Sequence, residues 1–165
     1  MINSYLSRQI TQNFPHNPTE DQFSALKTLT DFLLSVESDT LLLLKGYAGT
    51  GKTSLVGALV KTLNELQQKT FLLAPTGRAA KVFSNYSGQK AYTIHKKIYR
   101  QKAFSNKPTG FMPADNLHKD TLFIVDEASM ISNDGIDSIS FGTGRLLDDL
   151  IQYVYSGENC RLILM

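Results

Sequence analysis

Apolar residues along the chain fall into short continuous runs, and longer stretches of helical spacing separate these runs. The run TLLLLK at 40–45 has no polar residue between its leucines, which predicts a strand covered on both faces, as in a parallel sheet. Three later runs predict further strands: TFLLAP at 70–75, TLFIVD at 121–126 and RLILM at 161–165.

Helical periodicity marks several of the segments before and between these runs. Residues 2–14 carry apolar side chains at near-helical spacing, and PHNP at 15–18 ends that helix. The next helix is predicted to begin at TEDQ, where Thr19 and Gln22 can form a capping box. Its expected buried stripe is Phe23, Leu26, Leu29 and Leu33. Further helices are predicted over KTSLVGALVKTLNELQQ, GRAAKVFSNY and RLLDDLIQYVY.

Strand and helix alternate along the chain, which predicts an α/β fold with a parallel sheet flanked by helices. A length of 165 residues is that of one domain, so we expect a single domain over residues 1–165. In this interpretation residues 1–18 are an N-terminal helix and linker. Loop excursions are expected at 100–118, where NKPTG and MPADN supply turn residues, and at 134–144.

Composition narrows the class of protein. Hydrophobic residues make up 42% and charged residues 19%, as in ordinary globular proteins. The single cysteine, Cys160, excludes an internal disulfide and fits a reducing compartment. The polar N-terminus does not have the pattern of a signal peptide, and the run of leucines at 41–44 is too short to span a membrane. We therefore expect a cytoplasmic protein without a membrane partner.

The first predicted strand leads directly into GYAGTGKT at 46–53, which matches the phosphate-loop pattern G-x-x-x-x-G-K-[ST]. Glycines let successive backbone N–H groups turn toward one anion, and the start of the following helix adds its positive dipole end. Lys52 is expected to neutralise the β- and γ-phosphates, and the Thr53 hydroxyl to ligate Mg²⁺. The candidate phosphate-binding residues are Gly46, Ala48, Gly49, Thr50, Gly51, Lys52, Thr53 and Ser54.

Two adjacent acids, Asp126 and Glu127, end the third predicted strand. Two carboxylates at the end of a buried strand are costly unless a cation lies nearby. We expect Asp126 to hold Mg²⁺ through water and Glu127 to polarise the attacking water, which makes Lys52, Asp126 and Glu127 the candidate catalytic residues. Turn residues at a strand end are the alternative interpretation of this pair.

Basic residues are concentrated between Leu66 and Ala114, where nine Lys and Arg occur without any Asp or Glu. Seven aromatic residues are interleaved with them. Such a segment suits single-stranded nucleic acid, because cations attract phosphates and aromatic rings stack on unpaired bases. A solvated basic face over ordinary core aromatics explains the same pattern, so composition alone leaves both interpretations open.

The nucleotide class can be narrowed from the residues. Guanine-specific switches need an NKxD element, and the sequence has NKPT at 106–109, with Thr109 where aspartate is needed. A water-activating Glu127 favours hydrolysis over phosphoryl transfer to a small acceptor. A small phosphate-loop kinase is the weaker alternative.

Four stretches occur in the order GYAGTGKTSL, APTGRAAKVF, TIHKKIY and VDEASMIS. They resemble successive motifs of the superfamily 1 DNA helicases, in particular the group that includes the exodeoxyribonuclease V alpha subunit. The resemblance extends from about Thr19 to Met165. It implies a first RecA-like motor domain that binds ATP and Mg²⁺ and couples hydrolysis to movement along single-stranded DNA.

The resemblance also implies roles for individual residues. Thr19 and Gln22 resemble the motif that recognises adenine, although the capping box explains Gln22 equally well and the two roles are compatible. The APTGRAA and TIH stretches resemble DNA-contacting motifs. The implied DNA-contacting residues are Thr76, Gly77, Arg78, Lys81, Thr93, His95 and Lys96. His16 and His118 are expected at the surface.

The last predicted strand, RLILM, corresponds to one that in RecA-like folds lies between the phosphate-loop strand and the Asp–Glu strand. In the resembled family a GDxxQ motif follows this strand, so we expect residues 1–165 to be a fragment truncated after its fourth core strand. The sensor glutamine, a second motor domain and its arginine finger would lie beyond, together with possible subunits of a helicase–nuclease complex. The fragment alone is expected to unwind little DNA, and a nucleotide- or DNA-binding module without turnover is the alternative.

Overall fold

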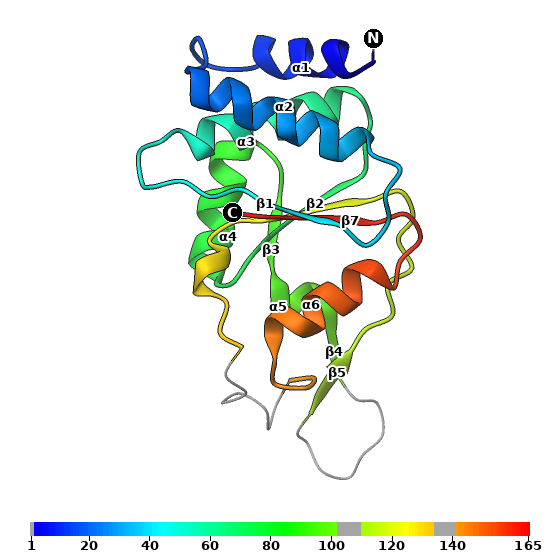
Figure 1. Ribbon diagram of the computed structural model, residues 1–165. Helices are drawn as coiled ribbons and strands as arrows, with labels where there is room; N and C mark the ends of the chain where they lie inside the picture. Colours follow the sequence, from blue (N-terminus) through cyan, green and yellow to red (C-terminus); the bar gives the residue numbers. More distant parts are fainter. Residues whose placement is uncertain (1, 102–109, 134–140) are drawn as a thin grey trace.

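The computed structural model describes residues 2–101, 110–133 and 141–165. A parallel sheet of five strands runs through its centre in the order β1-β7-β6-β2-β3 (Figure 1). These strands are β1 Leu41–Leu43, β2 Thr70–Ala74, β3 Ala91–Thr93, β6 Leu122–Val125 and β7 Arg161–Leu164. The predicted α/β fold with a parallel sheet is confirmed.

The last strand of the sequence is central in the sheet. Strand β7 lies between β1 and β6, and Ile163 is in register with Leu42 on one side and Ile124 on the other. The expectation that RLILM separates the phosphate-loop strand from the Asp–Glu strand is therefore confirmed. Because both neighbours are parallel to β7, the carboxyl ends of all three strands meet at one edge of the sheet.

Strand β1 differs from its prediction. It pairs with β7 on one side only within the described residues, and Leu41 and Leu43 are 41% and 49% exposed. The expectation of cover on both faces is wrong for this strand. A continuous apolar run reports that side chains can be buried on both faces, but it does not report whether an element packs there.

Helices cover the two faces of the sheet unequally. Helices α1 Ile2–Gln12, α2 Glu20–Leu34, α3 Lys52–Glu65 and α4 Gly77–Ser87 share one apolar cluster with the sheet. Helices α5 Ile94–Ile98 and α6 Leu146–Tyr155 share the cluster on the other face. Residues of β6 alternate between the two clusters, with Ile124 in the first and Phe123 in the second. The result is a three-layer α/β/α arrangement (Figure 1).

Helix α2 begins as predicted, because Thr19 and Gln22 form the capping box. Its buried stripe differs from the prediction: Phe23 is 53% exposed, Leu33 is half-buried, and Thr30 is buried in addition to Leu26 and Leu29. Helix α1 packs against α2, and Leu6 and Ile10 of α1 share one apolar cluster with Leu26 and Leu29.

Several short elements were not expected. Strand β3 and helix α5 lie within TIHKKIY and the residues before it. In the excursion at 100–118, β4 Tyr99–Gln101 and β5 Phe111–Pro113 form an antiparallel pair, while residues 102–109 lie outside the described residues. A 3₁₀ turn, η1 Ala128–Met130, follows Glu127. Of the excursion predicted at 134–144, residues 134–140 also lie outside the described residues. Within the described part of the chain, no helix is long and apolar enough to cross a bilayer.

Candidate functional site

The GYAGTGKT loop lies at the carboxyl edge of the sheet, between the end of β1 and the first residue of α3, Lys52. Gly49 and Gly51 both have positive φ angles, 80° and 84°. A Cβ atom on Gly51 would lie 2.1 Å from the Gln22 Nε2 atom. The backbone conformation therefore favours glycine at position 51, and a side chain there would displace the Gln22 amide.

Lys52 folds back over the loop that precedes it. Its ammonium group donates hydrogen bonds to the carbonyl oxygens of Gly46 and Tyr47, the second at 2.9 Å. The Thr50 hydroxyl also donates to the Tyr47 carbonyl, at 2.8 Å. This arrangement keeps the ammonium beside the N-terminal end of α3, where free backbone N–H groups and the helix dipole also favour an anion.

Asp126 and Glu127 follow β6 at the same edge of the sheet. Leu43, Leu164 and Val125 are in register across β1, β7 and β6. Adjacent strands lie about 4.8 Å apart, so the end of β6 is about 10 Å from the end of β1. The two carboxylates therefore follow the same carboxyl edge of the sheet as the phosphate loop, and β7 lies between the two strands that lead to them.

The backbone around the two acids is held by neighbouring strands. The Asp126 N–H donates to the Leu73 carbonyl at 3.0 Å, and the Ala128 N–H donates to the Met165 carbonyl at 2.6 Å. Glu127 has a φ of 56° in the left-handed region, which is uncommon for a residue with a side chain. Its side chain is exposed, whereas Asp126 is half-buried.

The Asp126 carboxylate has two hydrogen-bond donors. One oxygen accepts from the Glu127 N–H at 2.9 Å, and the other accepts from the Tyr86 hydroxyl at 2.8 Å. Burial, together with the hydrogen bond to Asp126, raises the pKa of Tyr86 far above its ordinary value, so the hydroxyl remains a donor. Sequence reasoning placed Tyr86 only among the interleaved aromatics, because nothing in the local sequence indicates its contact 40 residues away.

Gln22 connects the start of α2 to the phosphate loop. Its Oε1 accepts from the Thr19 N–H at 3.0 Å, which completes the capping box, and its Nε2 donates to the Thr50 carbonyl at 3.1 Å. A hollow of about 260 Å³ lies beside this contact. Its lining includes Asp21, Gln22, Leu44, Gly46, Gly51 and Lys52. The predicted adenine-recognising residue thus touches the predicted phosphate-binding loop.

The candidate DNA-contacting residues lie at the ends of two adjacent strands, β2 and β3. Ala74 of β2 is in register with Thr93 of β3. Thr76 caps α4 by accepting from the Ala79 N–H, and Thr93 caps α5 by accepting from the Lys96 N–H, each at 3.2 Å. The remaining candidates are Gly77, Arg78, Lys81 and Lys96, which are exposed, and the half-buried His95. The fold thus brings the two predicted motifs to the same edge of the sheet as the phosphate loop.

His95 packs against aromatic side chains. Its ring centroid lies 4.9 Å from that of Phe141 and 5.7 Å from that of Tyr99. Tyr99 in turn donates its hydroxyl to Asp149 at 2.6 Å, and burial with this contact raises the pKa of Tyr99. The histidine therefore has a packing role in addition to any contact with a ligand.

The basic segment 66–114 does not form one uniform face. Lys97 is half-buried with its ammonium 3.4 Å from the centre of the Phe71 ring and 2.8 Å from the His118 Nε2 atom. Burial lowers the pKa of Lys97, and burial with the nearby Lys97 and Lys69 cations lowers the pKa of His118. Arg100 pairs with Asp115 at 3.3 Å. His118, expected at the surface, is half-buried, because its ring packs on Phe71.

Most of the described aromatic residues of this segment are at least partly buried. Phe83 is fully buried, Tyr99 is buried, and Phe71 and Tyr86 are half-buried. Phe111 is exposed in part and stacks on Phe141. Among the described residues, the structure therefore favours the interpretation of packed aromatics over that of exposed rings. Phe104, Lys102 and Lys107 lie outside the described residues.

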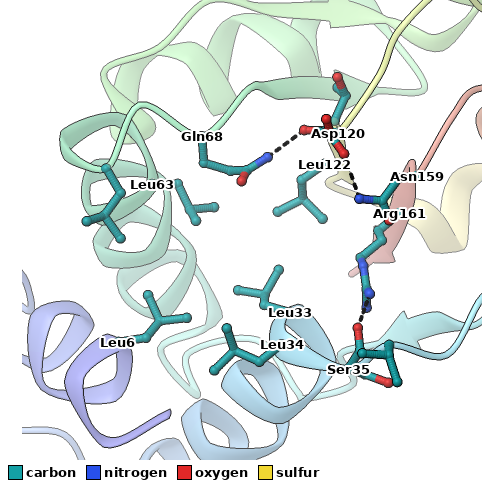
Figure 2. Close-up of a pocket in the computed structure, with 13 residues that line it drawn as sticks. Leu6, Leu33, Leu34, Ser35, Leu63, Gln68, Asp120, Leu122, Asn159 and Arg161 are labelled. Atoms are coloured by element: carbon teal, nitrogen blue, oxygen red, sulfur yellow. Dashed lines mark hydrogen bonds between the residues drawn. The ribbon is translucent and has the colours of Figure 1, made fainter. Parts of the chain in front are cut away.

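A larger hollow of about 600 Å³ lies at the amino ends of β6 and β7, away from the phosphate loop (Figure 2). Leucines from α1, α2 and α3 line one side, and Arg161 donates to the carbonyl oxygens of Phe32 and Ser35. Asn159 donates to an Asp120 carboxylate oxygen at 2.7 Å. The polar groups shown here bind one another and the backbone.

The donor set available for a metal is small. Within the described residues, no three His, Cys, Asp or Glu side chains are close enough to hold an ion together. Proteins hold Mg²⁺ with one or two carboxylates plus the phosphates of a substrate and water. Thr53 and Asp126, the predicted Mg²⁺ ligands, both lie at this edge of the sheet, where Glu127 offers a further carboxylate.

Comparisons with known proteins agree with this geometry. Residues 19–140 match a protein family described as AAA domain. An ATP-dependent RecD2 DNA helicase of Deinococcus radiodurans is 32% identical over 116 residues, which are 70% of this chain and 14% of that helicase. The chain thus spans a small part of that relative.

Proposed function

Since the chain belongs to the AAA domain family, we propose that it is the ATP-binding N-terminal motor domain of an ATP-dependent DNA helicase. The observation that carries this proposal is the position of Asp126 at the same sheet edge as the 46–53 loop, with one strand between them. The similarity to a DNA helicase over 70% of the chain supports the choice of a helicase over a small phosphate-loop kinase.

Binding of the triphosphate rests on the loop and on Lys52. When phosphate enters, the Lys52 ammonium exchanges the carbonyl oxygens of Gly46 and Tyr47 for phosphate oxygens, which carry more negative charge. The positive φ angles of Gly49 and Gly51 let the loop backbone curve around the anion. Thr53, and Asp126 through water, would hold Mg²⁺, which would supply charge neutralisation at the phosphates.

Selection of adenine rests on Gln22. Each of its two side-chain groups has one hydrogen bond within the protein, to Thr19 and to Thr50. A primary amide has two donor hydrogens and two acceptor lone pairs, so one donor and one acceptor remain. That pair matches the N6 donor and N7 acceptor of adenine. The capping and adenine-binding roles of Gln22 are thus chemically compatible.

Hydrolysis rests on Glu127, whose exposed carboxylate is proposed to polarise the attacking water. Transition-state charge in phosphoryl transfer is commonly stabilised by an arginine finger, which is worth about 10³–10⁵ in rate. Translocation in this proposal requires a second motor domain, so residues 1–165 by themselves are expected to turn over ATP slowly and to unwind little DNA.

Equilibrium binding of ATP to Lys52→Ala tests the nucleotide site. Loss of a charge-assisted contact to phosphate should weaken binding at least about tenfold. Lys61→Ala is the matched control, because Lys61 is an exposed lysine on the same helix, and its ATP affinity should stay near that of the unsubstituted protein. Equal affinity of Lys52→Ala and Lys61→Ala would overturn the proposal.

Turnover separates two forms of the proposal. ATP hydrolysis stimulated by single-stranded DNA indicates a motor domain that is active alone. Binding of ATP without any turnover indicates a nucleotide-binding module whose hydrolysis depends on residues outside 1–165. Transfer of phosphate to a nucleoside or metabolite would instead support a kinase and contradict the helicase assignment.

Single-stranded DNA is the proposed polymeric partner. Thr76 and Thr93 begin helices at one edge of the sheet, and Arg78, Lys81 and Lys96 are exposed close to these two helix starts. Backbone N–H groups and cations arranged in this way favour phosphate oxygens. Binding of oligothymidine should weaken as salt rises, and binding independent of salt would remove this part of the proposal.

A further inference from the structure

The contact between Tyr86 and Asp126 joins α4 to the end of β6. Tyr86 lies in the last turn of α4, and its ring packs on Phe83 with a centroid distance of 5.1 Å. Phe83 is fully buried, so one face of the Tyr86 ring packs on a fixed side chain. Gly57 on α3 approaches the backbone of Tyr86, since a Cβ at position 57 would lie 3.5 Å from the Tyr86 carbonyl oxygen. The Tyr86 hydroxyl is therefore held by packing of both the ring and the backbone of this residue.

The Asp126 carboxylate is held in one orientation. The Glu127 N–H binds Oδ1 and the Tyr86 hydroxyl binds Oδ2, while the Asp126 N–H is fixed to Leu73 on the neighbouring strand. A carboxylate has about four lone-pair positions, so each oxygen keeps a free lone pair after these bonds. The free lone pairs are available to water on a cation.

Tyr86 also lines a groove that includes the other proposed magnesium ligand, Thr53. Thr53 and Tyr86 line the same groove, a space of about 630 Å³ between α3 and α4. Tyr86 thus lines this groove together with Thr53, and its hydroxyl donates a hydrogen bond to Asp126. It is not itself suited to ligate Mg²⁺, because a neutral phenol is a weak ligand compared with carboxylate, water or phosphate oxygen.

From this geometry we infer that Tyr86 is a positioning residue, which orients Asp126 toward magnesium-bound nucleotide. The inference rests on the proposed function and adds a residue that the phosphate-loop and Asp–Glu patterns do not contain. Partners that orient a metal-binding carboxylate contribute to metal affinity although they do not touch the ion. Tyr86→Phe removes the donor and leaves the ring packing on Phe83 in place.

The test measures equilibrium binding of a fluorescent ATP analogue, once in excess EDTA and once in excess Mg²⁺. The ratio of the two affinities is the gain from magnesium. We expect Tyr86→Phe to bind the analogue in EDTA as tightly as the unsubstituted protein does. Its gain from magnesium should be about tenfold smaller. Tyr155→Phe is the matched control, because its hydroxyl also donates one hydrogen bond, to the Thr40 carbonyl before β1, away from Asp126.

Each outcome decides the inference. A reduced magnesium gain in Tyr86→Phe alone supports it. An unchanged gain, an equal loss in both tyrosine variants, or an equal loss with and without Mg²⁺ overturns it, since a purely structural role would affect both conditions. If Lys52→Ala loses binding while Tyr86→Phe keeps the full gain, the proposed function stands without the inference. Failure of the unsubstituted protein to bind the analogue would overturn both.

Discussion

Individual basic residues between Leu66 and Ala114 have different surroundings, although their side chains are alike in the sequence. Lys97 lies over Phe71, Arg100 pairs with Asp115, and Lys90 lies 5.3 Å from the centre of the Tyr92 ring. Arg78, in contrast, is exposed in the first turn of α4, next to the cap residue Thr76. Charges already engaged within the protein have less to offer a phosphate, so Arg78 is the stronger candidate for DNA contact.

Replacement of Arg78 by alanine should weaken binding of oligothymidine at low salt. Because one phosphate contact is lost, the slope of log affinity against log salt should become shallower by about 0.7. Arg8→Ala is the control, since Arg8 is exposed on α1, outside the basic segment. Fluorescence anisotropy over a range of salt concentrations measures both slopes. Parallel slopes for the two variants would show that Arg78 contacts no phosphate.

Elements on the second face of the sheet are joined by a buried acid. Asp149 in α6 is 3% exposed and accepts hydrogen bonds from the Tyr99 hydroxyl and from the backbone and side chain of Thr143. A Cβ on Gly142 would lie 2.2 Å from the Asp149 carboxylate, so the turn before α6 passes very close. One side chain thus connects α6, β4 and the turn at 141–144.

Asp149→Ala should lower the free energy of unfolding by about 3 kcal/mol, because it leaves the buried Tyr99 hydroxyl and the two donors of Thr143 without their acceptor. Asp148→Ala is the matched control: the neighbouring acid is exposed, pairs with Arg145 at 3.3 Å, and should cost less than about 1 kcal/mol. Urea denaturation of both variants measures the difference. Similar midpoints would mean that the Asp149 contacts contribute nothing to the stability of this face.

The whole molecule is organised around a central strand that comes last in the sequence. Strand β7 pairs with β1 and β6, and Ile163 is fully buried in the cluster shared with α1–α4. The residue after β7 also contacts the candidate site, because the Met165 carbonyl accepts a hydrogen bond from the Ala128 N–H. Formation of the sheet core and placement of the Asp–Glu turn therefore both depend on the final residues of 1–165.

Truncation of Ile163 tests this arrangement. Ile163→Ala should destabilise the protein by about 2–5 kcal/mol, the usual cost for a buried aliphatic side chain. Leu43→Ala, at the edge strand, removes the same three carbon atoms from a half-exposed position and should cost clearly less, because little of that surface is withdrawn from water. Thermal or urea unfolding compares the two, and equal costs would contradict the central position of β7.

Prediction from the sequence succeeded where a signal is local. The capping box at Thr19, the strand–loop–helix at 40–65 and the strand before Asp126 depend on residues close together in the chain, and each is present in the structure. Prediction failed where a short element depends on its neighbours. Strand β3 has three residues and carries no run of its own; it exists because it pairs with β2. Strands β4 and β5 likewise exist because they pair with each other.

The sequence by itself determined the α/β class and the residues of the phosphate loop, since glycine positions and apolar spacing act through local backbone conformation. It also indicated the acid pair Asp126–Glu127. Only the tertiary structure decided that Tyr86 binds Asp126, that Lys97 and the aromatics of its segment are largely engaged in packing, and that β1 is half-exposed. These features depend on contacts between residues far apart in the chain, and burial of a given side chain is fixed only when all layers have assembled.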